Sequence, residues 1–531
     1  MNIKKHIQTT LILIALILPQ TTLFANNIQV SDVKLTGQNT TLKYTMVQFN
    51  ISWENSWRST DLENNWDAAW IFVKFRIKPG SVWNHASLNN DGHMAPAGSV
   101  IEVGFPVINE PFNAKTNPAV GVFLYRSEAN TGTGDVNYTG VQLRWNYGID
   151  GLDERDSIEV SVFAIEMVYI PEGPFYVGDG VDPGSNSPGR FVAGNTTKPF
   201  KITTEEELTI GNSSNTELWG TSTSGDASIG TTGTLPAEFP KGFQSFYIMK
   251  YELSQYMYKE YLNKLTRAQQ AANVSATTVG RFMRNSNIGT EPLYRNGIKV
   301  ISDPGGTLPR EYSNNLNNDG EENDSADGQH IACNWLSFYD LMAFADWSGL
   351  RPFTELEYEK ACRGPLYPIA DEYAWRTDDM IWATGIDKSG MTDECATNAE
   401  ANIVTGRASG VYGPMRCGCF ANDTTNREQA GATFYGVMEM SGNLWEYAYS
   451  VGIEDNRSFN GNNHGDGKIA DNGTTNVTGW PTGAGIRGGA WYDLYYSNNQ
   501  QVSSRYNASY VYKTTRYIST GIRLARTQQK P

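Results

Sequence analysis

A Gly-Asn step flanked by two glutamates is the feature that most constrains this 531-residue chain. It lies in the stretch FYGVMEMSGNLWE, where Glu439 and Glu446 bracket Gly442 and Asn443. A Gly-Asn pair lets the backbone turn back with φ > 0, so that carbonyl and carboxylate oxygens can converge on one point. Such oxygen ligands suit Ca²⁺, which binds hard oxygens in a loose geometry. The alternative is a tight turn whose two glutamates pair with arginines, and these residues alone leave both interpretations open.

Three stretches together resemble a known family. Gly436–Glu446 is similar to the signature of the formylglycine-generating-enzyme, or sulfatase-modifying factor, family, and Arg487–Trp491 and Gly521–Arg526 match its two closing motifs. The resemblance covers residues 165–531 and suggests a non-catalytic, bacterial-type exported member. It implies an irregular α+β fold related to C-type lectins, with few short helices.

The resemblance also implies a calcium site at the turn. Carried over by position, the ligands are the side chains of Glu439 and Glu446 and the carbonyls of Gly442 and Leu444. The family usually has Asp or Asn where Glu439 stands, so one ligand is longer here. We expect Ca²⁺ as a structural ion.

Residues 1–25 have the pattern of a secretory signal peptide. Lys4 and Lys5 form a charged start, Leu11–Leu18 an apolar run, and Leu23–Ala25 the end expected before cleavage. The apolar run is too short to cross a bilayer, so we expect no transmembrane segment in the mature protein. The net charge of −15 argues against nucleic acid as a partner, since phosphate binding needs a basic face. We therefore expect an exported protein that is periplasmic, attached to the cell surface or secreted.

Residues 26–163 are predicted to form an antiparallel β-sandwich. Gly, Asn and Asp turns separate short strand-like segments, which are Val47–Trp53, Ile71–Ile77, Val122–Tyr125, Val141–Trp145 and Ile158–Phe163. Several short strands with regular turn signals are typical of a sandwich. We expect this segment to fold independently, with few contacts across the join near Glu166.

Residues 164–531 are expected to form the sulfatase-modifying-factor-like domain. Ser254, Ser337 and Thr354 are good N-caps, and each precedes an apolar stripe or a capping box typical of a helix. Residues 180–235 are rich in Gly, Ser, Thr and Asn, and we expect long surface loops there.

The stretch Asn315–Gly328, NLNNDGEENDSADG, is dense in Asp, Asn and Glu. It is a candidate for a second calcium loop, although it lacks the complete ligand spacing of an EF-hand. The alternative is a solvated acidic loop.

Six tyrosines between the two closing motifs are candidates for a ligand-binding face: Tyr492, Tyr495, Tyr496, Tyr506, Tyr510 and Tyr512. Tyr interspersed with Ser and Asn offers rigid contact area and adaptable hydrogen bonds. The alternative is that these tyrosines line strands. On the first interpretation we expect a protein or glycan ligand.

The cysteines bear on catalysis. Catalytic members of the family bind Cu(I) through two cysteines between the closing motifs, whereas residues 490–520 of this chain contain none. The non-heme-iron branch needs a histidine cluster, and the five histidines here are scattered. Copper and iron are therefore not expected.

For Cys417 and Cys419, which are too close to bond each other without strain, the simplest interpretation is a disulfide from one of them to Cys395.

These observations favour an exported binding or structural module of the cell envelope or extracellular space, stabilised by calcium. The alternative is an oxidoreductase of the formylglycine-generating or non-heme-iron type.

Overall fold

The computed structural model describes residues 27–80, 82–130, 132–181, 189–221, 229–406, 410–422, 424–494, 498–509 and 512–528. The predicted signal peptide lies outside these ranges. Within them, no helix is both long enough and apolar enough to cross a membrane.

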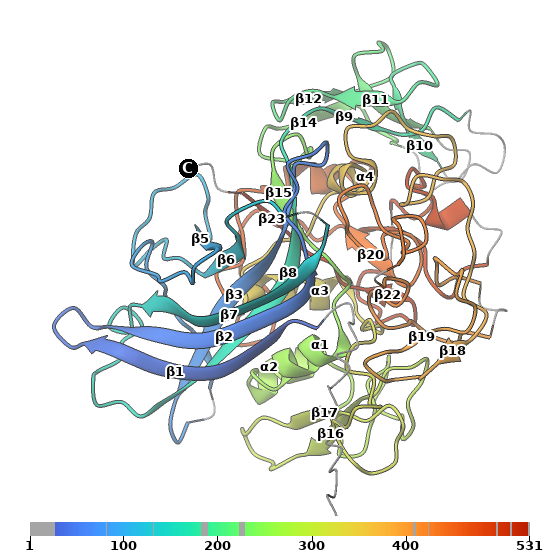
Figure 1. Cartoon of the computed structure of the whole chain (residues 1–531). Helices are drawn as coiled ribbons and strands as arrows, with labels where there is room; N and C mark the ends of the chain where they lie inside the picture. The colour runs from blue at the N-terminus through green and yellow to red at the C-terminus, as the bar shows by residue number, and fades with distance from the viewer. Residues whose placement is uncertain are drawn as a thin grey trace, which may run out of the picture.

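Two antiparallel sheets form the N-terminal part of the molecule (Figure 1). The first has the order β1-β2-β7 and consists of β1 (Gln29–Asn39), β2 (Tyr44–Ser56) and β7 (Gly134–Trp145). The second contains, in order, β8 (Ile158–Ile170), β3 (Asp67–Ile77), β6 (Gly121–Arg126) and β5 (Ser99–Gly104), with β4 (Asn84–His85) paired to β3. The apolar core between the sheets confirms the predicted sandwich.

Strand β3 is buried on both faces because its alternating side chains serve two cores. Ala69, Ile71, Val73 and Phe75 point into the sandwich. Ala68, Trp70 and Phe72 belong instead to the core of the C-terminal domain. A strand buried on both sides is expected to be apolar nearly throughout, as β3 is.

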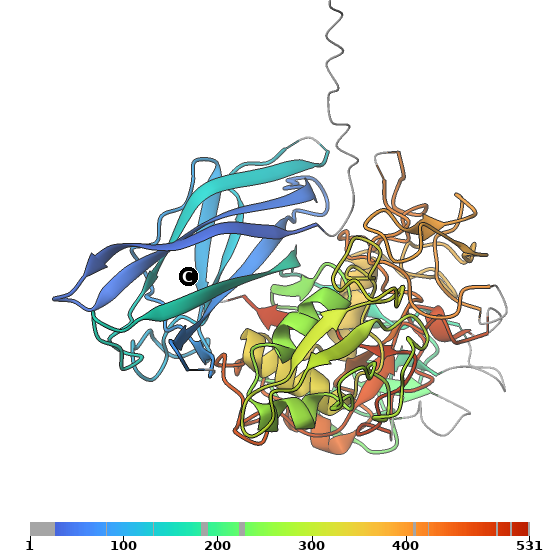
Figure 2. The ribbon, with the colours of Figure 1, turned by 90° about the horizontal axis from the view of Figure 1, so that it is seen from below.

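The sandwich and the C-terminal domain share one sheet. On the side of β8 away from β3, the sheet continues through β15 (Phe246–Met249) to β23 (Ala525–Thr527). Strand β8 therefore runs across the predicted boundary at residues 163 and 164 and is paired on both sides of it. Figure 2 shows the two parts side by side.

The expectation of few contacts across the join is wrong. The Trp70 indole N–H donates to Ser348 O at 2.8 Å, and the Arg526 guanidinium lies 4.4 Å from the Trp70 ring. The ammonium of Lys74 donates to Trp347 O at 2.7 Å and to Gly467 O at 2.6 Å. One face of β3 therefore depends on the C-terminal domain for its apolar and polar partners.

Four helices are found in the described residues: α1 (Gln255–Leu262), α2 (Arg267–Asn273), α3 (Phe338–Ser348) and α4 (Glu355–Arg363). The predicted caps of α1, α3 and α4 are confirmed, since the side chains of Ser254, Ser337 and Thr354 accept the expected backbone N–H bonds. Helix α2 was not predicted. Its capping box is formed by Thr266 and Gln269.

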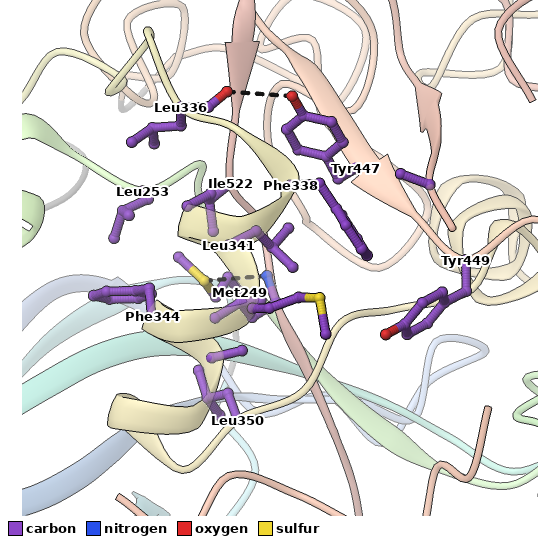
Figure 3. Packing of buried hydrophobic residues seen from close by; sticks show 14 of the residues in the cluster. Met249, Leu253, Leu336, Phe338, Leu341, Phe344, Leu350, Tyr447, Tyr449 and Ile522 are labelled. Atoms are coloured by element: carbon purple, nitrogen blue, oxygen red, sulfur yellow. Dashed lines mark hydrogen bonds between the residues drawn. The ribbon is translucent and has the colours of Figure 1, made fainter. Parts of the chain in front are cut away.

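Helix α3 is the centre of the C-terminal core (Figure 3). Phe338, Leu341 and Phe344 pack with Met249 of β15 and with Ile522, which follows the second closing motif's glycine. Aromatic residues supply much of this core, so short elements can bury a large apolar area.

The remaining elements are short. They are β9 (Phe175–Val177), β10 (Arg190–Ala193), β11 (Phe200–Ile202), β12 (Leu208–Ile210), β13 (Leu218–Thr221), β14 (Gly233–Leu235), β16 (Ile298–Ser302), β17 (Glu311–Asn314), β18 (Ile386–Asp387), β19 (Cys395–Ala396), β20 (Trp445–Ala448), β21 (Gly485–Arg487), β22 (Thr520–Gly521) and the 3₁₀ turns η1 (Glu454–Ser458) and η2 (Asn498–Gln500). Strands β10, β13, β12 and β14 form one sheet, so the prediction that residues 180–235 are only loops is wrong. The α+β class with few short helices is confirmed.

Replacing Trp70, which is fully buried, tests the shared core. Trp70→Ala should lower the free energy of unfolding by about 3–5 kcal/mol, because it removes a large buried side chain. Urea unfolding followed by far-UV circular dichroism should show one transition for the parent protein. The exposed Leu42 supplies a control, and Leu42→Ala should change the free energy by less than about 0.5 kcal/mol. Separate transitions for the two parts would contradict the shared core.

Candidate functional site

The three motifs singled out in the sequence meet in one small sheet. Its order is β21-β20-β22, with β20 antiparallel to β21 and parallel to β22. Glu446 on β20 is paired with Arg487 on one side and with Gly521 on the other. The motifs are therefore parts of one structure.

The turn before β20 has the backbone conformation expected from its sequence. Glu439, Gly442 and Asn443 have φ values of 54°, 90° and 58°. A Cβ on Gly442 would lie 2.5 Å from Cγ1 of Ile403, so glycine is required there for space as well as for its positive φ.

Glu446 is fully buried and pairs with an arginine. Arg523 contacts its Oε1 through Nε and Nη2, each at 2.7 Å, and also donates to the carbonyl of Met438. Glu439 is also buried, and its Oε1 accepts the backbone N–H of Gly418 at 2.6 Å. The second carboxylate oxygen of each glutamate is buried without a hydrogen-bond partner. Glu446 thus has an arginine partner, as expected if the turn is only a tight turn whose glutamates pair with arginines. Glu439 does not have such a partner in the described ion pairs.

A third buried carboxylate, Glu252, completes the site and was missed in the sequence. It accepts the Leu444 N–H at 2.9 Å and a hydrogen bond from the Asn443 side chain. Glu252 lies three residues after β15, and no local motif marks it; a contact spanning 192 residues has no short-range signal.

The electrostatics of the three carboxylates favour added positive charge. Burial raises the pKa of Glu439 to about 7, although Arg523 opposes the shift. Burial, together with the charge of Glu446, raises the pKa of Glu252 well above its ordinary value. Buried carboxylates of this kind must be protonated, or paired with a cation or other positive group.

Calcium binding at this turn stays a prediction. Within the described ranges, no group of three or more His, Cys, Asp or Glu side chains is arranged so as to hold a metal ion. Calcium would therefore have to draw on the carbonyls of Gly442 and Leu444 as well as on Glu439 and Glu446. The two unpartnered carboxylate oxygens fit that ligand type.

Arg487 of the first closing motif joins a buried ion network with helix α4. Its guanidinium contacts Glu355 at 3.1 Å and Glu359 at 2.8 Å. Arg505 also contacts Glu355, at 2.9 Å, and Arg363 contacts Glu359 at 2.6 Å. Burial alone would raise the pKa of Glu355, but the two arginines outweigh it and leave that pKa below its ordinary value.

The tyrosine-rich stretch is only partly described. Tyr506 is 47 % exposed and Tyr512 is 62 % exposed, while Tyr492 is half-buried with its ring edge-to-face against Trp491. Tyr495, Tyr496 and Tyr510 lie outside the described residues. The ligand-binding face therefore stays a prediction, and two of its described rings are exposed.

The predicted disulfide is wrong, because all five cysteines lie in the described ranges and all are free. The thiol of Cys417 donates to the carbonyl of Glu252 at 3.4 Å, so it points toward the carboxylate site. Burial raises the pKa of every one of the five thiols above its ordinary value, which disfavours the reactive thiolate: Cys333, Cys362, Cys395, Cys417 and Cys419.

A cleft of about 550 Å³ lies between the sandwich and the C-terminal domain. It is lined by the start of β1, by β8, by α1 and by residues 323–330, and it places aromatic rings beside acidic groups: Tyr251, Tyr256, His330, Glu166, Glu260 and Asp324. No local pattern could reveal it, because its walls come from segments that are far apart in the chain.

Arg523→Ala tests the buried pair. Removing the cation leaves Glu446 charged and uncompensated, so the free energy of unfolding should fall by about 3–5 kcal/mol in urea denaturation. The double variant Arg523→Ala/Glu446→Gln should recover part of this loss. The control is Arg76→Ala, which breaks the partly exposed pair with Glu159 and should cost less than about 1 kcal/mol. An Arg523→Ala loss no greater than that of the control would contradict the analysis.

One family model, described as “Sulfatase-modifying factor enzyme 1-like domain”, matches residues 159–528. The match begins at the start of β8 and ends after β23, so it includes the shared strand and all three motifs. No curated protein matches the chain.

Proposed function

The chain belongs to the family with a sulfatase-modifying factor enzyme 1-like domain, and from this premise we propose that it is a non-catalytic, exported binding or structural module of the cell envelope or extracellular space, stabilised by calcium. A fold of this kind does not determine activity, so the proposal depends on the chemistry available at the site.

The observation that carries the proposal is the missing thiol pair. Residues 490–520, between the two closing motifs, contain no cysteine. Cu(I) requires soft thiolate ligands, which hydroxyl and amide groups do not replace. The five cysteines elsewhere have raised thiol pKa values, so their thiolate forms are disfavoured at neutral pH.

Two surfaces support a binding role. The exposed rings of Tyr506 and Tyr512 offer a flat, amphipathic contact area for a protein or glycan. The cleft between the sandwich and the C-terminal domain has the size of a ligand site and combines aromatic and acidic walls. Export is supported by the charged and apolar pattern of residues 1–25.

Calcium is supported by the unpartnered, buried carboxylate oxygens of Glu439 and Glu446. Arg523 neutralises only one of three neighbouring carboxylates by direct contact, so a cation would remove the remaining cost of burial.

The activity test uses the mature protein with copper, oxygen and a peptide that carries the family's Cys-x-Pro-x-Arg target. We expect no loss of the peptide thiol and no aldehyde above a copper-only control, measured by mass spectrometry and aldehyde labelling. Aldehyde formation by the protein would overturn the non-catalytic proposal. In that case Cys417→Ser and Cys419→Ser would show whether the buried pair supplies the thiols.

The calcium test uses Glu439→Gln, which removes one carboxylate charge while keeping an oxygen for the Gly418 N–H. A chelator should lower the melting temperature of the parent protein, because an ion that binds only the folded state stabilises that state. At a free calcium concentration about one hundred times Kd, the ion raises the free energy of unfolding by about 2.7 kcal/mol. In Glu439→Gln that loss should shrink and the bound calcium should fall by one ion. The control is Glu128→Gln at an exposed position. A parent protein that binds no calcium at this turn would refute the proposal for the site.

A further inference from the structure

Residues 315–328, which follow β17, bring several oxygen-bearing side chains together away from the turn site. The Asn317 amide donates to Asp319 at 2.9 Å and to Asp324 at 3.4 Å, so it bridges two carboxylates. The Asp324 N–H donates to Oδ2 of Asp327 at 2.9 Å. Three aspartates thus lie around one short loop.

Two side chains of this loop are fully buried with unpartnered oxygens. Asp327 and Asn315 are each 0 % exposed. Oδ1 of Asp327 and Oδ1 of Asn315 are buried and accept no hydrogen bond. An unpaired carboxylate oxygen in such a place is costly, so a missing positive partner is indicated.

Nearby positive charge does not supply that partner. The neighbouring lysine, Lys299, pairs with Glu322 at 3.1 Å. Among the residues that the structure describes, Asp319, Asp324 and Asp327 form no ion pair.

The sequence spacing supports a cation loop. Asn315, Asn317 and Asp319 alternate and are followed by Gly320, which is the spacing of the first half of an EF-hand loop. Gly320 has a φ of 95°, as the sharp turn at that position needs. The position of the bidentate glutamate is taken by Ala326, so the second half of the ligand set must differ.

We propose that residues 315–328 bind one divalent cation of the calcium type, with Asn315 and Asp327 as buried ligands, Asp324 as a partly exposed ligand and Asp319 as an exposed one. Amide and carboxylate oxygens in a flexible loop suit Ca²⁺, whereas Mg²⁺ demands a stricter geometry and dehydrates reluctantly. In the described residues these three aspartates are not already arranged to hold a metal ion, so cation binding would draw their carboxylates together.

The site would also organise the cleft. Asn323, Asp324 and Ser325 form part of the cleft wall, and Gly328 N donates to Gly390 O at 3.0 Å on the opposite side of the loop. A cation that holds Asp324 and Asp327 together therefore fixes one wall of the cleft.

Proteolysis at the loop gives a local readout. Glu321 is exposed, so a glutamate-specific protease can cleave after it when the loop opens. In the full mature chain, Ca²⁺ should slow this cleavage at least tenfold relative to a chelator, and Mg²⁺ at the same concentration should not. Fragments are identified by mass spectrometry.

Variants separate this site from the turn. Asp327→Asn keeps an oxygen that can accept the Asp324 N–H, but it should abolish the protection by Ca²⁺ against cleavage. Asp319→Asn, at an exposed position, should raise the calcium concentration that gives half-maximal protection at least tenfold. Ser325→Ala, an exposed neighbour without a ligand role, should keep full protection. Glu439→Gln should also keep it, so this result is independent of calcium at the turn. Equal cleavage with and without Ca²⁺ in the parent, or unchanged protection in both Asp variants, would overturn the proposal.

Discussion

The buried ion network that joins helix α4 to Arg487 of the first closing motif and to Arg505 is the interaction on which the C-terminal domain depends. Arg487 and Arg505 meet Glu355, and Arg487 and Arg363 meet Glu359, all without access to water. A domain with few regular elements has few backbone ladders to hold its segments in place. Any other arrangement of these segments would leave a buried charge without its partner, which is strongly destabilising. The ion pairs therefore fix the positions of the segments relative to one another.

Local features of the fold could be predicted, because their cause lies within a few residues. The caps at Ser337 and Thr354 were recognisable since each side chain bonds to the backbone three residues on. Helix α2 was missed although Thr266 and Gln269 form the same box, because RAQQAAN carries no apolar stripe. Strands β10, β12, β13 and β14 were missed because each is only three or four residues long and is defined by pairing with segments elsewhere in the chain.

Features that depend on distant residues could not be predicted in the same way. The motif around Gly442 identified the turn, but Glu252 reaches it from another part of the chain. The segment Ile71–Ile77 was correctly predicted to be part of a strand, yet its sequence does not say which parts of the chain cover its two faces. The domain boundary was expected in the middle of β8 for that reason: periodicity gives the direction of a side chain and not the identity of its neighbour.

Strand β8 also determines how a mechanical load passes through the molecule. It is paired with β3 of the sandwich along one edge and with β15 of the C-terminal domain along the other. A force applied to the sandwich therefore reaches the C-terminal domain through rows of backbone hydrogen bonds, and no flexible linker lies between them to absorb it. The relative orientation of the two parts is therefore set by the twist of a single sheet.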